Sequence, residues 1–329
     1  MGASDDRMSA EDRLIADYFK PIATHPGALA LTDDAAFVTP APGTDVVLKT
    51  DAIIGGVHFF AEDDARDVAR KALRVNLSDL AAKGATPLGF LVSLALPKDT
   101  SADWLKRFAL GLREDAEAYA CPLFGGDTDR TPGPVMVSIS MFGSVPSGAM
   151  VRRAGARPGH RVFVSGTIGD AALGLVLRQG AAWPLTAAQR EHLLARYLLP
   201  QPRNALAEVV RAYASAAMDV SDGLAGDLTK LCRVSGVAAH IDVAAVPLSD
   251  AARAAVAADA AMRETALTGG DDFEVLCTVP PARADAFRMA ARAAGVPVTD
   301  IGVVEAGAGA HFMDGGRELA FQRLSFSHF

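Results

Sequence analysis

The stretch "MDVSDGLAGDL", residues 218–228, carries three carboxylates within nine residues. Asp219 and Asp222 stand where an apolar run ends, and Asp227 lies within the helical pattern that follows. An apolar run, a short segment containing glycine and then a helical pattern together indicate a strand, a loop and a helix. The stretch therefore predicts a strand with an acidic end, followed by a helix over residues 224–235.

Carboxylates recur in this setting along the chain, near the end of an apolar segment and beside small residues. They are Asp33 and Asp34 in "LTDDAAF", Asp51 in "LKTDAI", Asp127 in "FGGDTDR", and Asp271 and Asp272 in "TGGDDFE", while Asp79 lies inside a mostly apolar helical pattern. Taken singly, each acid is explained by a turn or a helix cap, and Ser221 or Asp222 before Gly-Leu suits an N-cap. Taken together, partly buried acids need cations, because an unpaired buried carboxylate is costly.

The cation that these residues favour is Mg²⁺. Most of the acids have no Lys or Arg close by in sequence, and Mg²⁺ prefers hard oxygen ligands. The glycine pairs Gly125-Gly126 and Gly269-Gly270 let the backbone approach a ligand closely. The residues alone therefore predict a Mg²⁺-dependent site for a phosphorylated substrate.

Composition limits the classes of function. A net charge of −7 argues against a nucleic-acid or anionic-membrane surface. The chain has no run of about 18 apolar residues and no apolar signal region in "MGASDDRMSAEDRL". Its three cysteines, Cys121, Cys232 and Cys277, are far apart, which favours a reducing compartment. We expect a soluble cytoplasmic protein that binds neither nucleic acid nor membrane.

The 329 residues suggest two domains, and the residue pattern changes near Val151. We expect domains over 1–150 and 151–329, both mixing strands and helices, in an α+β or α/β fold. The expected helices are 9–20, 63–84, 101–119, 169–179, 186–198, 203–214, 224–235, a long Ala-rich stretch to about 266, and 281–294. One expected strand begins at about 45, and another follows a Gly/Pro-rich turn within residues 152–166. The others cover 88–97, 135–145, 238–243, 272–279 and 298–304.

Eight motifs occur in a fixed order: "TDDAA", "TDAIIGGVHF", "KALRVNLSDLAAKGATPLGFLVSLALP", "GGDTDR", "RRAGARPGH", "SGTIGDAALGL", "MDVSDGLAGDL" and "TGGDDFEV". In this combination the chain resembles the thiamine-monophosphate kinases, within the superfamily that includes aminoimidazole ribonucleotide synthetase. The resemblance runs from about residue 11 to the C-terminus. It implies an N-terminal mixed α/β half that binds ATP and Mg²⁺ and pairs its sheet across a homodimer, and a C-terminal α/β layer domain that completes the substrate site.

The resemblance also implies the reaction and its residues. The reaction is ATP-dependent phosphorylation of thiamine monophosphate to thiamine diphosphate. The implied Mg²⁺ ligands are Asp34, Thr50, Asp51, Asp79, Asp127, Asp219 and Asp222, of which Asp51, Asp79, Asp127 and Asp219 act in catalysis through several metal ions. The implied nucleotide contacts are Gly126, Asp127, Arg153 and Ser221, and the implied thiamine-phosphate contacts are His58, Asp271 and Phe326.

Some of these residues have a simpler interpretation beside the functional one. His58 next to Phe59-Phe60 suits a packing histidine, Phe326 suits a core position, and Arg153 suits a surface ion pair. The chain also departs from the family pattern at three positions. Lys49 replaces a usual Ser beside a metal, Asp271 replaces a usual Glu, and Thr32 replaces a usual Gly.

The chemistry of the implied reaction explains the acids. Donor and acceptor are both anionic, and two unit charges about 4 Å apart repel by roughly 4 kcal/mol at an effective dielectric constant near 20. Shared Mg²⁺ ions cancel that repulsion and orient an in-line transfer. A phosphate monoester loses its second proton at a pKa of about 6, so we expect no dedicated general base. The alternatives are another ATP-dependent synthetase of the superfamily, a metal-dependent phosphohydrolase, and a nucleotide-binding protein without turnover.

Overall fold

A computed structural model of the chain describes residue 9 and residues 13–325. The chain divides into two compact units. The first comprises the described residues up to Asn76 together with Pro87–Ser144, and the second comprises Leu77–Thr86 and the residues from Val145 onward. In the described part, no helix is both long and apolar enough to cross a membrane.

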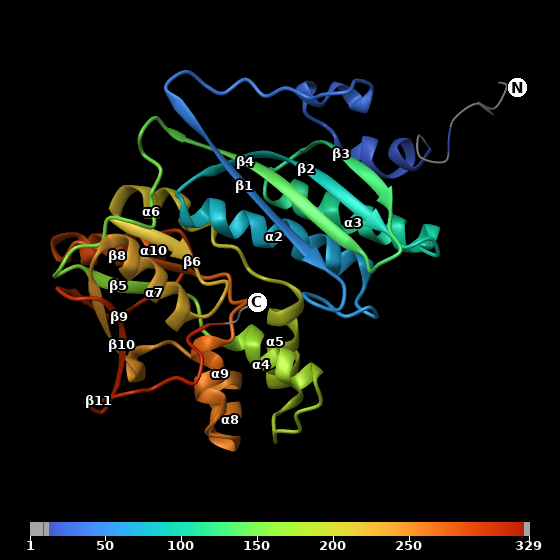
Figure 1. The fold of residues 1–329 in the computed structure, drawn as a ribbon. Helices are drawn as coiled ribbons and strands as arrows, with labels where there is room; N and C mark the ends of the chain where they lie inside the picture. Colours follow the sequence, from blue (N-terminus) through green and yellow to red (C-terminus); the bar gives the residue numbers. More distant parts are fainter. Residues whose placement is uncertain (1–8, 10–12, 326–329) are drawn as a thin grey trace, which may run out of the picture. The chain divides into compact units, whose positions relative to one another are not determined.

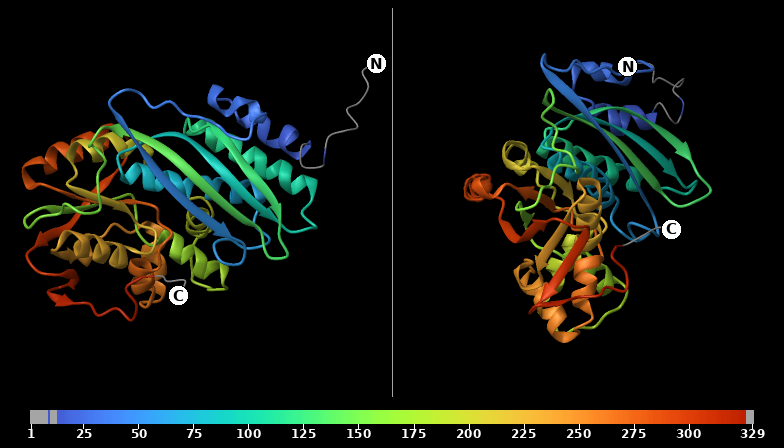
Figure 2. Two further views of the ribbon diagram at one scale, coloured as in Figure 1. Left: turned by 45° about the horizontal axis from the view of Figure 1, so that its top comes forward. Right: turned by 60° about the vertical axis from the view of Figure 1, so that its left-hand side comes forward.

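The first unit is built on a four-stranded sheet in the order β1-β4-β2-β3. Helices α2 and α3 lie against one face of it (Figures 1 and 2). The bounds are β1 Thr44–Ile54, β2 Thr86–Leu96, β3 Leu123–Arg130 and β4 Met136–Pro146 for the strands, and α2 Ala65–Ala82 and α3 Ala102–Ala118 for the helices. The helices expected over 63–84 and 101–119 are thereby confirmed.

Strand β4 shows why one face of the sheet is covered. Its residues alternate between buried and half-buried, with Val137, Ile139 and Met141 buried and Ser138 and Ser140 half-buried. Successive side chains of a strand point to opposite faces, so the apolar set packs under the helices and the polar set faces the other way.

The N-terminal segment and β3 differ from expectation. Within the expected helix 9–20 the structure forms a π-helical turn at Ile15–Phe19, and 3₁₀ turns follow at Lys20–Ile22 and Pro26–Leu31. Pro21 lacks a backbone donor, which disfavours a continuing α-helix. Strand β3 was not expected, because its sequence "LFGGDTDR" is rich in residues that disfavour strands. Parallel pairing with β2 overrides that preference.

A buried ion pair joins α2 to α3. The Asp115 carboxylate is 2% exposed and accepts hydrogen bonds from Arg74 Nε at 2.6 Å and Arg74 Nη2 at 3.0 Å. Arg70 Nε also donates to it, at 3.3 Å. Burial alone would lower the pKa of Arg74, but the hydrogen bonds and charge of Asp115 outweigh burial and raise it. This buried ion pair therefore holds α2 against α3, and each of its two charges is balanced by the other.

We expect Asp115→Ala to lower the free energy of unfolding by about 3–5 kcal/mol, because the Arg74 guanidinium stays buried without this carboxylate. Urea denaturation measures the change. The matched control is Asp285→Ala, which removes an ion pair to Arg288 at 2.7 Å from a carboxylate that is 95% exposed. That control should change stability by less than about 0.5 kcal/mol. Equal losses in the two variants would contradict the role of burial.

The second unit is built on a seven-stranded sheet in the order β11-β10-β7-β9-β5-β8-β6. Strands β7 and β10 pair in parallel, and the other neighbours pair in antiparallel fashion. The bounds are β5 Arg161–Ser165, β6 Ala216–Asp219, β7 Ala238–Asp242, β8 Val275–Val279, β9 Val298–Glu305, β10 Gly309–Asp314 and β11 Arg317–Glu318. Strands β10 and β11 were not expected.

Helices cover both faces of this sheet (Figure 2). Val162 and Val164 of β5 pack in one core with Leu228 of α7, whereas Phe163 between them packs in another core with Phe287 of α10. A strand that is apolar on both faces fits a layer covered on both sides. The helices are α4 Asp170–Arg178, α5 Ala187–Leu198, α6 Ala207–Tyr213, α7 Leu224–Ser235, α8 Asp250–Ala258, α9 Met262–Thr268 and α10 Ala284–Ala293.

The expectation of one long Ala-rich helix to about 266 is wrong. Helix α8 begins after Ser249, whose hydroxyl group caps it by accepting from Ala252 N at 2.9 Å. The helix ends at Ala258. The next residue, Asp259, takes an extended conformation, and its Oδ1 accepts a hydrogen bond from Ala261 N at 3.0 Å before α9 begins. Ser and Asp compete for backbone hydrogen bonds in this way, and they therefore break an Ala-rich pattern.

Candidate functional site

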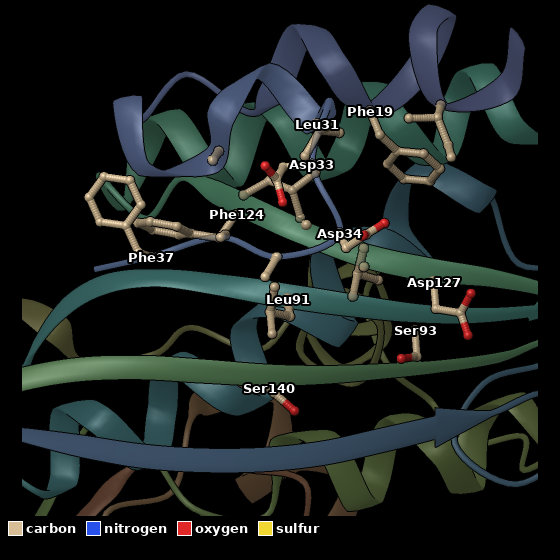
Figure 3. Close-up of a pocket in the computed structure, with 18 of the residues that line it drawn as sticks. Phe19, Leu31, Asp33, Asp34, Phe37, Leu91, Ser93, Phe124, Asp127 and Ser140 are labelled. Atoms are coloured by element: carbon tan, nitrogen blue, oxygen red, sulfur yellow. The ribbon is translucent and has the colours of Figure 1, made fainter. Parts of the chain in front are cut away.

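A cavity of about 690 Å³ lies in the first unit, between the N-terminal segment and strands β2, β3 and β4 (Figure 3). In the view of Figure 3, the rings of Phe37 and Phe124 lie toward one end and the side chains of Asp34, Asp127 and Ser93 toward the other. The cavity thus offers both an aromatic wall and carboxylates. Its residues include Phe19, Leu31, Asp33, Asp34, Phe37, Leu91, Ser93, Phe124, Gly126, Asp127 and Ser140.

The pairing of β2 with β3 places Asp127 at the cavity. Gly126 stands opposite Val92, and Asp127 opposite Ser93. A Cβ atom on Gly126 would lie 1.9 Å from the Val92 carbonyl oxygen, so only glycine allows this strand contact. The sequence suggested that this glycine lets backbone approach a ligand. The structure shows that it first lets the two strands approach each other.

Strand β1 carries Thr50 and Asp51. The Thr50 hydroxyl group donates to the Ile139 carbonyl oxygen at 3.1 Å and accepts from Ser140 Oγ at 3.3 Å, and Ser140 lines the cavity. Lys49 Nζ lies 3.0 Å from Asp51 Oδ2, and the Asp51 side chain is 45% exposed. Lys49, which stands in place of a usual Ser, therefore sets a cation beside one of the predicted metal ligands.

His58 follows β1 and is half-buried. Its Nδ1 accepts a hydrogen bond from Ile54 N at 3.0 Å, and its carbonyl oxygen accepts from Lys71 Nζ at 2.9 Å. These bonds fix the orientation of the ring within the turn. The packing interpretation of His58 is thereby supported, and its predicted contact with substrate stays a prediction.

The second unit brings Asp219, Ser221, Asp222 and Asp271 together. Asp219 is 5% exposed and ends β6. The segment after it, residues 219–223, is joined by backbone hydrogen bonds to residues 270–274. Val220 N donates to the Glu274 carbonyl oxygen, Phe273 N to that of Val220, and Asp271 N to that of Ser221, each at 2.8 Å. Two loops that lie about 50 residues apart in sequence are thus held together by backbone hydrogen bonds, and both carry acids.

The residue beside Asp79 reaches the same pair of loops. Ser78 Oγ donates to the carbonyl oxygen of Phe273 at 3.3 Å, within the second unit. Asp79 itself is half-buried, as the apolar helical pattern predicted. The C-terminal end of α2 therefore lies against the loop that carries Asp271.

Backbone strain is concentrated in the loop that carries Asp271. Asp271 and Phe273 have φ values of 61° and 52°, in the left-handed region that non-glycine residues rarely occupy. Gly270 between the loops has a φ of 80°, and a Cβ atom on it would lie 2.4 Å from the Ser221 carbonyl oxygen. The expected strand over 272–279 consequently begins only at Val275.

A buried carboxylate anchors that strained loop. Glu274 is fully buried and accepts hydrogen bonds from Ser165 Oγ at 2.6 Å, Arg196 Nη2 at 2.8 Å and Arg203 Nε at 2.6 Å. Asp272 is also buried, and both its oxygens accept from Gly169 N at 2.9 Å. Burial raises the pKa of Asp272 well above its ordinary value. Asp272 is therefore a structural acid.

Asp227 holds the loop after β6. One of its oxygens accepts from the backbone nitrogens of Ser221 and Asp222, each at 2.9 Å, and the other accepts from Lys230 Nζ at 2.8 Å. Lys230 also donates to Asp222. Burial opposes the charge of Lys230, but the hydrogen bonds with Asp222 and Asp227 outweigh burial and raise the pKa of its ammonium group.

The alternative interpretation of Asp222 as a helix N-cap is wrong. Gly223 occupies the N-cap position of α7, with no side-chain hydrogen bond to the helix. Asp222 instead faces Lys230, which comes eight residues later, two turns along the helix. The sequence carried a signal for the Lys230–Asp227 pair, because residues three apart on a helix are neighbours. The sequence carried no such signal for the contacts of Arg196 and Arg203 with Glu274, because these residues meet only in the folded unit.

The remaining predicted site residues are Arg153 and Phe326. Arg153 lies in the exposed loop before β5, where its carbonyl oxygen accepts from Ser235 Oγ at 3.5 Å. Phe326 lies outside the described residues.

The predicted Mg²⁺ ligands fit the ion by donor chemistry. Among the residues that the structure describes, no three His, Cys, Asp or Glu side chains are grouped closely enough to hold a metal ion. The predicted set nevertheless consists of carboxylate and hydroxyl oxygens, the hard donors that Mg²⁺ prefers. Asp51 and Asp222 already lie beside the ammonium groups of Lys49 and Lys230. Both positions therefore attract positive charge.

Comparison with known proteins places these features in a family. Residues 32–145 match the family model described as AIR synthase related protein, N-terminal domain, and residues 157–314 match its C-terminal domain counterpart. The chain is 42% identical over 318 residues to the thiamine-monophosphate kinase of Caulobacter vibrioides, covering 95% of this chain and 89% of that protein. The chain belongs to the thiamine-monophosphate kinase family.

Solved structures of this family have the same fold. The thiamine-monophosphate kinase of Stenotrophomonas maltophilia K279a matches with a TM-score of 0.83 at 38% identity, covering 93% of this chain and 96% of that one. The structure of "AaThiL complexed with AMPPCP and TMP" matches with a TM-score of 0.77 at 33% identity, covering 90% of this chain and 91% of that one. The resemblance read from the motif order and the two-domain fold of this superfamily are thereby confirmed.

We expect Asp227→Ala to lower the free energy of unfolding by at least about 2 kcal/mol, because it removes the acceptor of two backbone amides and of Lys230. Thermal unfolding followed by circular dichroism measures it. The matched control is Asp242→Ala, an exposed acid of the same unit that accepts from Ala244 N at 3.0 Å. The free energy of unfolding of this control should fall by less than about 1 kcal/mol. If both variants lose the same, Asp227 is an ordinary surface cap.

Proposed function

We propose that this protein is an ATP-dependent kinase that converts thiamine monophosphate to thiamine diphosphate. One observation carries the proposal. The chain matches a family structure described as complexed with AMPPCP and TMP, and the match covers 90% of this chain. The cavity and the acidic loops supply what such a reaction needs, namely a binding space for a nucleotide and oxygen ligands for cations.

Residues 1–150 would bind ATP, with Gly126 and Asp127 at the 690 Å³ cavity as nucleotide contacts. This volume lies within the usual range for small-molecule sites, about 300–1,000 Å³. Residues 151–329 would supply Arg153 and Ser221 to the nucleotide. The two groups of residues would serve one reaction.

The acids Asp34, Asp51, Asp79, Asp127, Asp219 and Asp222, together with Thr50, would hold several Mg²⁺ ions. When bound, Mg²⁺ neutralises phosphate charge. The residues of the chain keep these ligands in place: Asp227 fixes the loop of Asp222, and the hydrogen bond from Asp271 N to Ser221 joins the two acidic loops. No side chain is assigned as a general base, because the acceptor phosphate is largely deprotonated near neutral pH.

The thiamine phosphate would contact His58, Asp271 and Phe326. The strained backbone at Asp271 supports this role, since left-handed non-glycine residues cluster at functional sites. Asp271 is one methylene shorter than the usual Glu, so the contact depends on the position of its loop. The packed Glu274 sets that position.

A homodimer is part of the proposal. Strand β1 stands at the edge of the first unit's sheet, and its Leu48 side chain is 72% exposed. An edge strand with an exposed large apolar side chain favours pairing with a second sheet.

The reaction is tested by incubating the protein with ATP, Mg²⁺ and thiamine monophosphate and separating the products by chromatography. We expect thiamine diphosphate to appear in step with ADP and to vanish when a chelator removes the metal. ADP and free phosphate without thiamine diphosphate would instead identify a phosphohydrolase. No ADP at all would point to a synthetase with another substrate or to a nucleotide-binding protein.

We expect Asp51→Asn to lower kcat by about 100-fold or more while the unfolding temperature changes little. The physical reason is that a metal-held carboxylate contributes several kcal/mol to the transition state, whereas this side chain is 45% exposed. Asp79→Asn and Asp219→Asn should likewise lose far more in turnover than in folding. The control is Asp45→Asn, an exposed acid on the same strand. A stable Asp51→Asn enzyme with full activity would exclude Asp51 as a metal ligand.

A further inference from the structure

A second pocket, of about 470 Å³, lies wholly in the second unit, between the loop before β5 and helix α6. Its charged lining residues are Arg152, Arg157 and Arg211, joined by His160, and none of its lining residues is Asp or Glu. The chain as a whole carries a net charge of −7. Three arginines that line one hollow are therefore a local feature that overall composition does not explain.

Arg211 is held in place by the backbone. Its guanidinium group donates to the carbonyl oxygen of Gly84, and a Cβ atom on Gly84 would lie 2.8 Å from the Cβ atom of Arg211. Glycine at position 84 thus makes room for this arginine. Glu208 Oε1 lies 3.7 Å from Arg211 Nη2 but its side chain is 82% exposed, so solvent screens its charge. The positive charge of Arg211 is fixed at the pocket wall and little compensated.

His160 and Ser215 form a polar wall of the pocket. His160 Nδ1 lies 2.7 Å from Ser215 Oγ, which in turn donates to the Thr278 carbonyl oxygen at 3.0 Å. Burial, and next the charge of Arg157, lower the pKa of His160. The groups facing this imidazole are thus cationic, and a bound anion would favour its protonated form.

A smaller part of the pocket is formed by apolar side chains. Met150, 39% exposed, lines it together with Ala154, Ala214 and Pro280. Arg153, the proposed nucleotide contact, is not among its lining residues. Guanidinium groups bind phosphate through paired charge-assisted hydrogen bonds, and an apolar wall suits a ring or carbon chain.

We propose that this pocket binds a small phosphorylated organic molecule, whose phosphate group lies among Arg152, Arg157 and Arg211 and whose carbon part lies against Met150 and Pro280. The site shares no lining residue with the cavity of the first unit. It does not depend on the proposed kinase reaction.

The test is calorimetric titration of the full chain with phenyl phosphate, with a chelator present so that no metal-dependent site takes up the probe. We expect saturable binding that Arg157→Gln weakens by about tenfold or more, the effect of losing one charge-assisted hydrogen bond. The matched control is Arg292→Gln, an exposed arginine of α10 outside the pocket, which should bind as the parent chain does. No saturable binding, or equal weakening by both variants, overturns the proposal.

Two further measurements sharpen the result. Inorganic phosphate should bind more weakly than phenyl phosphate, and equal binding would exclude the organic ligand in favour of a free anion. The pKa of His160, followed by NMR, should rise when phenyl phosphate binds, and an unchanged pKa would place the probe elsewhere. ATP turnover of Arg157→Gln should stay at the parent level. Loss of turnover together with binding would assign the pocket to the nucleotide site and overturn a separate one.

Discussion

The buried charge of Glu274 is the constraint on which the acidic loops of the second unit depend. A carboxylate that is fully buried must find cations and hydrogen bonds, and this one finds Arg196, Arg203 and Ser165. Ser165 also accepts from Val275 N at 2.8 Å, so the start of β8 is fixed by the same group. Because the Glu274 carbonyl oxygen accepts from Val220 N, the loop that carries Asp222 is fixed with it. The left-handed residues Asp271 and Phe273 persist because the surrounding bonds determine their positions.

Two lysines place positive charge beside predicted metal ligands. Lys49 lies beside Asp51 in the first unit, and Lys230 beside Asp222 in the second. An ammonium group in such a place stabilises an acid when no metal is bound, and a divalent ion must then compete with it. In the structure, the ammonium groups of Lys49 and Lys230 therefore balance part of the negative charge of these carboxylates.

The two units place their functional residues by different physical means. In the first, β2 and β3 approach so closely at Gly126 that Asp127 and Ser93 stand side by side at the cavity. In the second, backbone hydrogen bonds between two loops assemble the acids, and Asp227 closes the arrangement from within α7. Strand pairing allows little movement, whereas the loops rely on side-chain charges. Changes of pH or of local charge should therefore affect the second group more than the first.

Much of this could be predicted from the sequence, and the physical reason is local. The helix at 224–235 follows from its apolar spacing and its place after "MDVSDG", and the order of the motifs identifies the family. The acids at the ends of apolar segments follow from the same patterns. The break in the Ala-rich stretch had a local signal in Ser249 and Asp259 that the apolar pattern hid. The strand formed by "LFGGDTDR" and the late start of β8 could not be predicted, because tertiary contacts overrode local propensity. The sequence by itself determined which residue types are candidates to meet phosphate and metal. Only the tertiary structure decided that Glu274 would find Arg196 and Arg203, and that Arg152, Arg157 and Arg211 would line one hollow, because these residues come together from segments far apart along the chain.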